Sequence, residues 1–125
     1  RFRAFIKLIT VFVMFLFMNL YIFDMEKLRK AYEMAVVVVL EVTELDREKL
    51  FKSLLEEYVD ARAILINWLV SVGYTERMIA EYSGMSQQRI NFLKNTFIYR
   101  KQRMSVGLCA QEINKRLTNC LQTSC

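Results

Sequence analysis

The chain has 125 residues, a formal net charge of +5, no proline, no histidine and three glycines. Because good helix formers dominate and turn dipeptides for hairpins are few, the composition favours an all-α fold, a small helical bundle, over a fold that contains a sheet. The lack of histidine excludes Ser-His-Asp and Cys-His catalysis, and the sequence has no glycine-rich phosphate loop. We therefore expect neither enzymatic activity nor a cofactor.

Residues 4–23, AFIKLITVFVMFLFMNLYIF, form a nearly unbroken apolar segment that is long enough to cross a bilayer as one helix. Two basic residues precede it, a third lies near its start and three more follow it, so the positive-inside rule gives no orientation. These residues are Arg1, Arg3, Lys7, Lys27, Arg29 and Lys30. The small-residue cleavage site of a signal peptide does not follow the segment.

Three interpretations of residues 1–24 stay open beside a domain over residues 25–125. The composition of the segment is typical of translated AT-rich non-coding DNA, and Met25 resembles a natural start. Alternatively, the segment is a genuine membrane anchor, or it is a buried first helix of the domain. A soluble domain would aggregate through an exposed helix that is apolar all round.

The first half of the domain is predicted to be helical, with one break. Apolar residues recur at helical spacing over residues 25–43, and residues with capping side chains cluster at 43–46. We expect a short helix over residues 47–54 and a long helix over residues 56–72. The long helix is apolar on most sides, which marks it as the central core helix, and Gly73 stands where a helix-ending glycine is expected.

The stretch TERMIAEYSGMSQQRINFLKN, residues 75–95, has the pattern of a helix-turn-helix. Thr75 suits the N-cap of a first helix, and Gly84 suits the left-handed residue that ends it. Ser86 is a second N-cap, and we expect the helix behind it to continue to about residue 100. The apolar face of this second helix consists of Ile90, Leu93 and Phe97.

Positive charge is concentrated from this second helix onward. Residues 86–116 contain seven basic residues and only one acidic residue, whereas residues 24–85 contain eight basic and twelve acidic residues. A polyanion that faced this surface would release counterions on binding, so its affinity would fall with salt. The alternative is a solvated basic face that keeps the protein soluble.

The last part of the domain is predicted to be a loop over residues 102–107 and a final helix over residues 108–121. It contains three cysteines, Cys109, Cys120 and Cys125. Their number is odd, their spacing lacks the C-x-x-C pattern, and no histidine is present to share a zinc ion. We therefore expect reduced thiols rather than a metal site or a disulfide.

The order of these helices and several short motifs resemble the C-terminal DNA-binding domain of the bacterial replication initiator DnaA, whose fold is shared with the Trp repressor. The family's first helix, its long helix and the first helix of its helix-turn-helix are matched by VVLEVTEL (residues 38–45), VDARAILINWL (59–69) and TERMIA (75–80). Its final I-x-x-x-L helix is matched by Ile113 and Leu117. The resemblance covers most of the chain after Met25.

Two departures from the family bear on function. The recognition-helix signature Arg-Asp-His-Thr-Thr-Val is replaced by MSQQRI (residues 85–90), so the initiator's site specificity does not carry over. The family's basic loop before the long helix is replaced by SLLEEY (53–58), whose acidic pair should repel phosphate. Arg62 matches the family's arginine at the start of the long helix, which implies a phosphate contact there.

The expected function is sequence-specific binding of double-stranded DNA, in transcriptional regulation or in control of a mobile element or phage. Side chains with the geometry to read base edges are Ser86, Gln87, Gln88, Arg89 and Asn91. Expected phosphate contacts are Arg62, Thr75, Lys94, Asn95, Arg100, Lys101 and Arg103. Because one copy reads only a few base pairs, a homodimer is a reasonable requirement.

Two rival functions accompany this expectation. In the first, the polar helix is part of a helical module that binds another protein, and affinity for nucleic acid is weak and non-specific. In the second, residues 4–23 anchor a DNA-binding regulator in the inner membrane, whereas the DNA-binding domain alone would be cytoplasmic.

Overall fold

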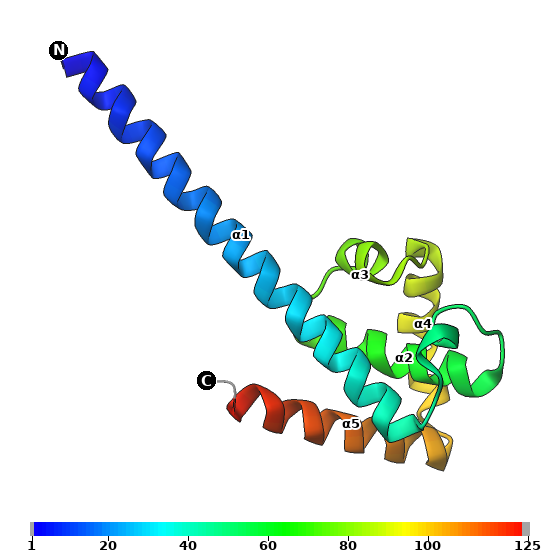
Figure 1. Ribbon diagram of the computed structural model, residues 1–125. Helices are drawn as coiled ribbons and strands as arrows, with labels where there is room; N and C mark the ends of the chain where they lie inside the picture. The colour runs from blue at the N-terminus through cyan, green and yellow to red at the C-terminus, as the bar shows by residue number, and fades with distance from the viewer. Residues whose placement is uncertain (1, 124–125) are drawn as a thin grey trace. The chain divides into compact units, whose positions relative to one another are not determined.

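The computed structural model describes residues 2–123, and its secondary structure there is entirely helical (Figure 1). The elements in chain order are α1 (Phe2–Thr43), the short 3₁₀ helix η1 (Arg47–Lys49), α2 (Glu56–Ser71), α3 (Glu76–Ser83), α4 (Gln87–Arg100) and α5 (Met104–Thr123). The described residues contain no strand, which confirms the all-α prediction. Arg1 and Cys125, which the sequence analysis singled out, lie outside the described residues.

The chain divides into two compact units, one that ends at Ala31 and one that begins at Tyr32. The boundary that the sequence predicts, between residues 24 and 25, lies inside α1. Helix α1 has no break at that point, because residues 2–43 contain neither proline nor glycine to interrupt it. We describe the two units separately.

The second unit has α2 at its centre. Helix α2 contacts α3, α4 and α5, and six consecutive residues, 61–66, are buried. A helix that is buried on every side has neighbours all round, so the prediction that this segment is the central core helix is confirmed. Its only tryptophan, Trp68, is 6% exposed and belongs to this core.

The expected short helix over residues 47–54 is wrong in extent. The structure has only the three-residue η1, which begins behind Asp46, whose side chain accepts a hydrogen bond from the amide of Glu48. The chain then turns and becomes extended at Leu55, the N-cap residue of α2. This extended residue lets α2 begin in a new direction, which a continuous helix over residues 47–54 would not allow.

The expected loop over residues 102–107 is also wrong, because α5 already begins at Met104. Gly107 was interpreted as a loop residue but lies inside the helix, and its amide donates to the carbonyl of Arg103 at 3.0 Å. A Cβ atom at this position would lie 2.9 Å from the carbonyl oxygen of Lys101. The glycine therefore permits a close approach between the first turns of α5 and the end of α4.

Three tyrosines join the last part of α1 to α3 within the second unit. The ring of Tyr32 lies 5.1 Å from the ring of Tyr82, and the ring of Tyr74 lies 6.4 Å from that of Tyr82. Tyr32 is 2% exposed, and its hydroxyl has no hydrogen-bond partner among the described residues. Burial raises the pKa of Tyr32 and also raises the pKa of Tyr74, to about 12.

Replacing Tyr32 with phenylalanine should raise the free energy of unfolding by about 1 kcal/mol, because the variant no longer buries an unpaired hydroxyl. Unfolding in guanidinium, followed by the fluorescence of Trp68, measures the change. Tyr99→Phe is the matched control, since Tyr99 is 70% exposed and its hydroxyl is already solvated. A loss of stability in Tyr32→Phe alone would show that the hydroxyl has a partner.

Candidate nucleic-acid interface

Helices α3 and α4 are joined by a three-residue connection whose capping residues agree with the sequence prediction. The Thr75 side chain accepts a hydrogen bond from the amide of Met78 at 3.2 Å, and the Ser86 side chain accepts one from the amide of Arg89 at 3.3 Å. Gly84 has φ +77, the left-handed conformation that ends α3 with little strain only when the residue is glycine. These local contacts fix where each helix begins and ends.

The outward face of α4 follows from the residues that it buries. Ile90, Leu93 and Phe97 are buried, so at 100° per residue the opposite side of the helix has four exposed residues. These are Gln88, Phe92, Asn95 and Tyr99. Phe92 and Tyr99 are 60% and 70% exposed. These two aromatic residues are not among the contacts predicted from the sequence, which are all polar, although their spacing from Gln88 places them on the same line.

The first turn of α4 brings together three of the predicted base-contacting residues. Gln87, Gln88 and Arg89 are all exposed. Arg89 has no carboxylate within ion-pair distance among the described residues. A hollow of about 260 Å³ lies beside Gln88 and Arg89, and Val59 and Phe92 form part of its wall. This turn therefore presents amide and guanidinium groups next to an apolar surface.

Two other side chains of α4 that are predicted to contact DNA bind Glu76, which lies in the first turn of α3. The Nζ of Lys94 lies 2.6 Å from Oε1 of Glu76, and the side-chain amide of Asn91 donates to the same oxygen at 3.0 Å. The hydrogen bonds from Lys94 and Asn91 hold the pKa of Glu76 below its ordinary value. Asn95 in turn donates to Asn91 at 3.0 Å. The three α4 side chains are thus linked to each other and to an acid.

Arg62 does not fit the expected phosphate contact, because its side chain is fully buried. Its Nε donates to the carbonyl of Tyr58 at 3.3 Å, and its Nη2 donates to the carbonyl of Ser53. Burial lowers the pKa of Arg62, and the charges of Arg89 and Arg100 lower it further. The guanidinium instead joins the segment before α2 to the first turns of that helix.

Arg100 and Arg103 are also expected phosphate contacts, and both are paired with carboxylates of α2. The Nη1 of Arg100 lies 2.9 Å from Glu56 and 2.9 Å from Asp60, and the Nη2 of Arg103 lies 3.1 Å and 2.7 Å from the same two residues. The acidic pair of the SLLEEY segment was expected to repel phosphate, and the structure shows that Glu56 of this pair forms direct ion pairs with both arginines. Lys101, between the two arginines, is exposed.

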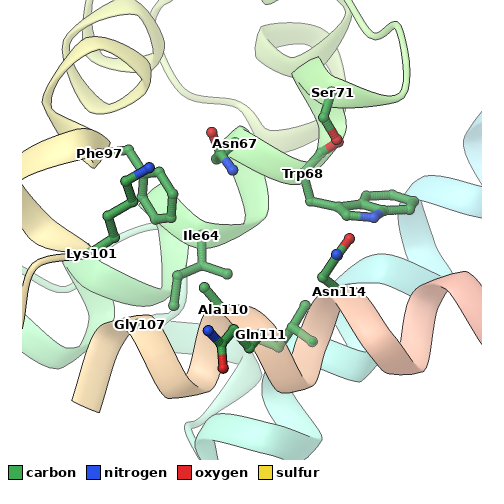
Figure 2. Close-up of a pocket in the computed structure, with 11 residues that line it drawn as sticks. Ile64, Asn67, Trp68, Ser71, Phe97, Lys101, Gly107, Ala110, Gln111 and Asn114 are labelled. Atoms are coloured by element: carbon green, nitrogen blue, oxygen red, sulfur yellow. The ribbon is translucent and has the colours of Figure 1, made fainter. Parts of the chain in front are cut away.

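A separate groove of about 420 Å³ lies between α2, the end of α4 and α5 (Figure 2). Trp68 and Asn114 form one end of the groove, and Phe97 and Lys101 lie toward the other. Among the described lining residues, Lys101 alone has a titratable side chain, so the lining offers no acid–base pair. The groove contains none of the predicted base-contacting residues. Cys109 and Cys120 are half-buried on α5, and the described residues contain no cluster of metal-ligating side chains.

Comparisons with protein-family models, with curated proteins and with solved structures find no match to this chain. The functional assignment therefore depends on the site itself. The structure leaves Ser86, Gln87, Gln88 and Arg89 together at an exposed helix start, with Lys101 exposed at the far end of the same helix.

Proposed function

We propose that the chain binds double-stranded DNA as a helix-turn-helix protein, with the first turn of α4 directed at base edges in the major groove. The observation that supports this most is the composition of that turn. It presents Gln87, Gln88 and Arg89 to solvent with no acidic residue among them. In helix-turn-helix proteins, residues near the start of the second helix make the base contacts.

The chemistry of these side chains suits direct readout. Glutamine can pair with adenine through two hydrogen bonds, and arginine can do the same with guanine. Phe92, one turn further along, is placed to contact a thymine methyl group, which is the apolar feature of the major groove. The pattern therefore supports recognition of a short mixed sequence rather than of phosphate alone.

Phosphate contacts are fewer in this proposal than the sequence suggested. Lys101 is exposed, and Asn95 is exposed on the outward line of α4. A phosphate at the start of α3, near Thr75, would lie beside the carboxylate of Glu76, which opposes the attraction of the helix N-terminus. Arg100, Arg103 and Lys94 would have to leave their carboxylates before they bound DNA.

The resemblance to the DnaA domain suggests the same mode of docking, without the initiator's specificity. We propose a role in transcriptional regulation or in control of a mobile element or phage. One copy of α4 reads only a few base pairs, so a homodimer on two half-sites would supply the length of site that a regulator needs.

Selection of the full chain on random duplexes, with a salt titration of the retained sequences, tests the proposal. We expect an enriched motif, and we expect Arg89→Ala to weaken binding to it by about 1–3 kcal/mol and to relax the preference at one position. Arg116→Ala is the matched control, since Arg116 is exposed on α5 and paired with Glu112. Equal effects of the two variants, or retention without a motif, would contradict base readout by Arg89.

A protein-binding function is favoured by one observation, the exposed Phe92 and Tyr99 on the outward line of α4. Aromatic residues are enriched in protein interfaces. Under this alternative, the random duplexes yield no motif, and binding disappears at moderate salt. A Phe92→Ala, Tyr99→Ala double variant would then lose the protein partner while its weak affinity for DNA stayed unchanged.

A further inference from the structure

The first half of α1 is an apolar helix whose large side chains are exposed. The large apolar side chains between Phe2 and Ile22 are 42–77% exposed, and the most apolar 18-residue window of the helix has a mean hydropathy of 2.2 with none of its residues buried. A core helix of a soluble protein would have the same composition but would be covered. Exposed apolar side chains in this number are unfavourable in water and favour an apolar environment.

The distribution of apolar residues around the helix identifies that environment. Exposed apolar side chains occupy every direction around the axis, as consecutive exposed residues such as Met14, Phe15 and Leu16 show. A second helix would cover only one stripe of such a surface, whereas lipid covers all of it. A bilayer is thus the occupant that leaves no face of the helix in water.

The segment has few polar side chains, and those between Lys7 and Asp24 are Thr10, Asn19 and Tyr21. No charged residue occurs between Lys7 and Asp24. Thr10 lies within this stretch, and its hydroxyl donates to the carbonyl of Ile6 at 2.9 Å, so the hydroxyl is satisfied inside the helix. A helix of 20 residues rises by roughly 30 Å, which is the thickness of the hydrocarbon core.

The ends of the segment carry residues that suit the membrane–water interface. Arg3 and Lys7 lie at one end, and Lys27, Arg29 and Lys30 lie just beyond the other. Long basic side chains at helix ends can extend to the headgroups, and Tyr21 stands near the second boundary, where tyrosine is enriched. No small-residue cleavage site separates Phe23 from Tyr32, and α1 runs through both without a break.

We propose that residues 4–23 cross a lipid bilayer as one helix and tether the unit that begins at Tyr32 to the membrane. This proposal does not depend on DNA binding. The second unit would act at the membrane surface whatever it binds there.

Flotation of the full chain tests the proposal. The chain, expressed in a bacterial host with a tag at its C-terminus, is washed in alkaline carbonate and centrifuged in a sucrose gradient. We expect it to float with the membranes and to have an intact N-terminus by mass. Sedimentation as an aggregate, release by carbonate, or cleavage near residue 23 would each overturn the proposal.

A variant separates insertion from other causes of flotation. Val13→Lys combined with Leu16→Lys places two charges in the middle of the segment and should abolish flotation. The control adds the same charges in the second unit, as Gln102→Lys with Thr118→Lys at exposed positions, and should still float. Continued flotation of the first variant would overturn the proposal.

Purified full-length chain in neutral phosphatidylcholine vesicles gives an independent measurement. Because these vesicles carry no net charge, binding to them cannot come from attraction of a basic protein to anionic lipid. We expect co-flotation that 1 M salt does not reverse, and binding that salt reverses would count against a spanning helix.

Discussion

Replacing Arg62 with alanine should lower the free energy of unfolding by about 2–4 kcal/mol, through loss of buried volume and of two hydrogen bonds. The Arg62 side chain is fully buried, and it donates to the carbonyls of Ser53 and Tyr58. Without this side chain, a cavity remains beside α2, and the segment before the helix loses its hydrogen bond to the guanidinium. Guanidinium unfolding followed by Trp68 fluorescence measures the loss.

Arg62→Met distinguishes the packing of this side chain from its hydrogen bonds. Methionine restores most of the apolar volume and removes a buried charge, so we expect a smaller loss than in the alanine variant. Hydrogen exchange at residues 53–58 should increase in both variants, because both lack the guanidinium donors. Unchanged stability together with weakened DNA binding would instead support the phosphate contact that the resemblance implies.

Replacing Asp60 with alanine should lower the free energy of unfolding by about 2 kcal/mol. Asp60 is 14% exposed and accepts hydrogen bonds from both Arg100 and Arg103. The side chain of Arg100 is 18% exposed and its Nε is already without a partner among the described residues. Without Asp60, the mostly buried guanidinium of Arg100 would therefore have only the exposed carboxylate of Glu56 as its partner.

Glu56→Ala is the matched control, because Glu56 faces the same two arginines but is 64% exposed. An exposed ion pair in water contributes less than about 1 kcal/mol, so this variant should remain close to the unchanged protein. The two variants alter the net charge equally. Equal losses of stability would show that burial does not set the strength of these pairs.

Much of the second unit could be predicted from sequence because its signals are local. Thr75, Gly84 and Ser86 each act on residues within four positions, and the structure confirms all three caps. The buried face of α4, with Ile90 and Phe97, follows from helical spacing alone. The role of Gly107 could not be predicted in this way. A glycine is needed there because the carbonyl oxygen of Lys101 lies too close for a side chain, and this contact depends on how α4 and α5 pack.

The pairing of the basic residues could not be predicted in the same way. Lys94 meets Glu76 across 18 residues of sequence, and Arg100 meets Asp60 across 40. A count of charges along the sequence treats every basic residue as available to a ligand, including those that are paired with carboxylates in the fold. Arg62 shows the same limit, since a match to a family motif cannot reveal that the segment before the helix folds over its side chain.

Carboxylates of this protein act as fixed counterions for several of its own basic residues. Of the seven basic residues over 86–116, four lie against carboxylates of the same chain, and Arg89, Lys101 and Lys115 have none within ion-pair distance among the described residues. A phosphate that approached Arg100 or Arg103 would have to displace a carboxylate rather than a mobile anion. Binding of a phosphate there would exchange one fixed anion for another, at the cost of the ion pairs with Glu56 and Asp60.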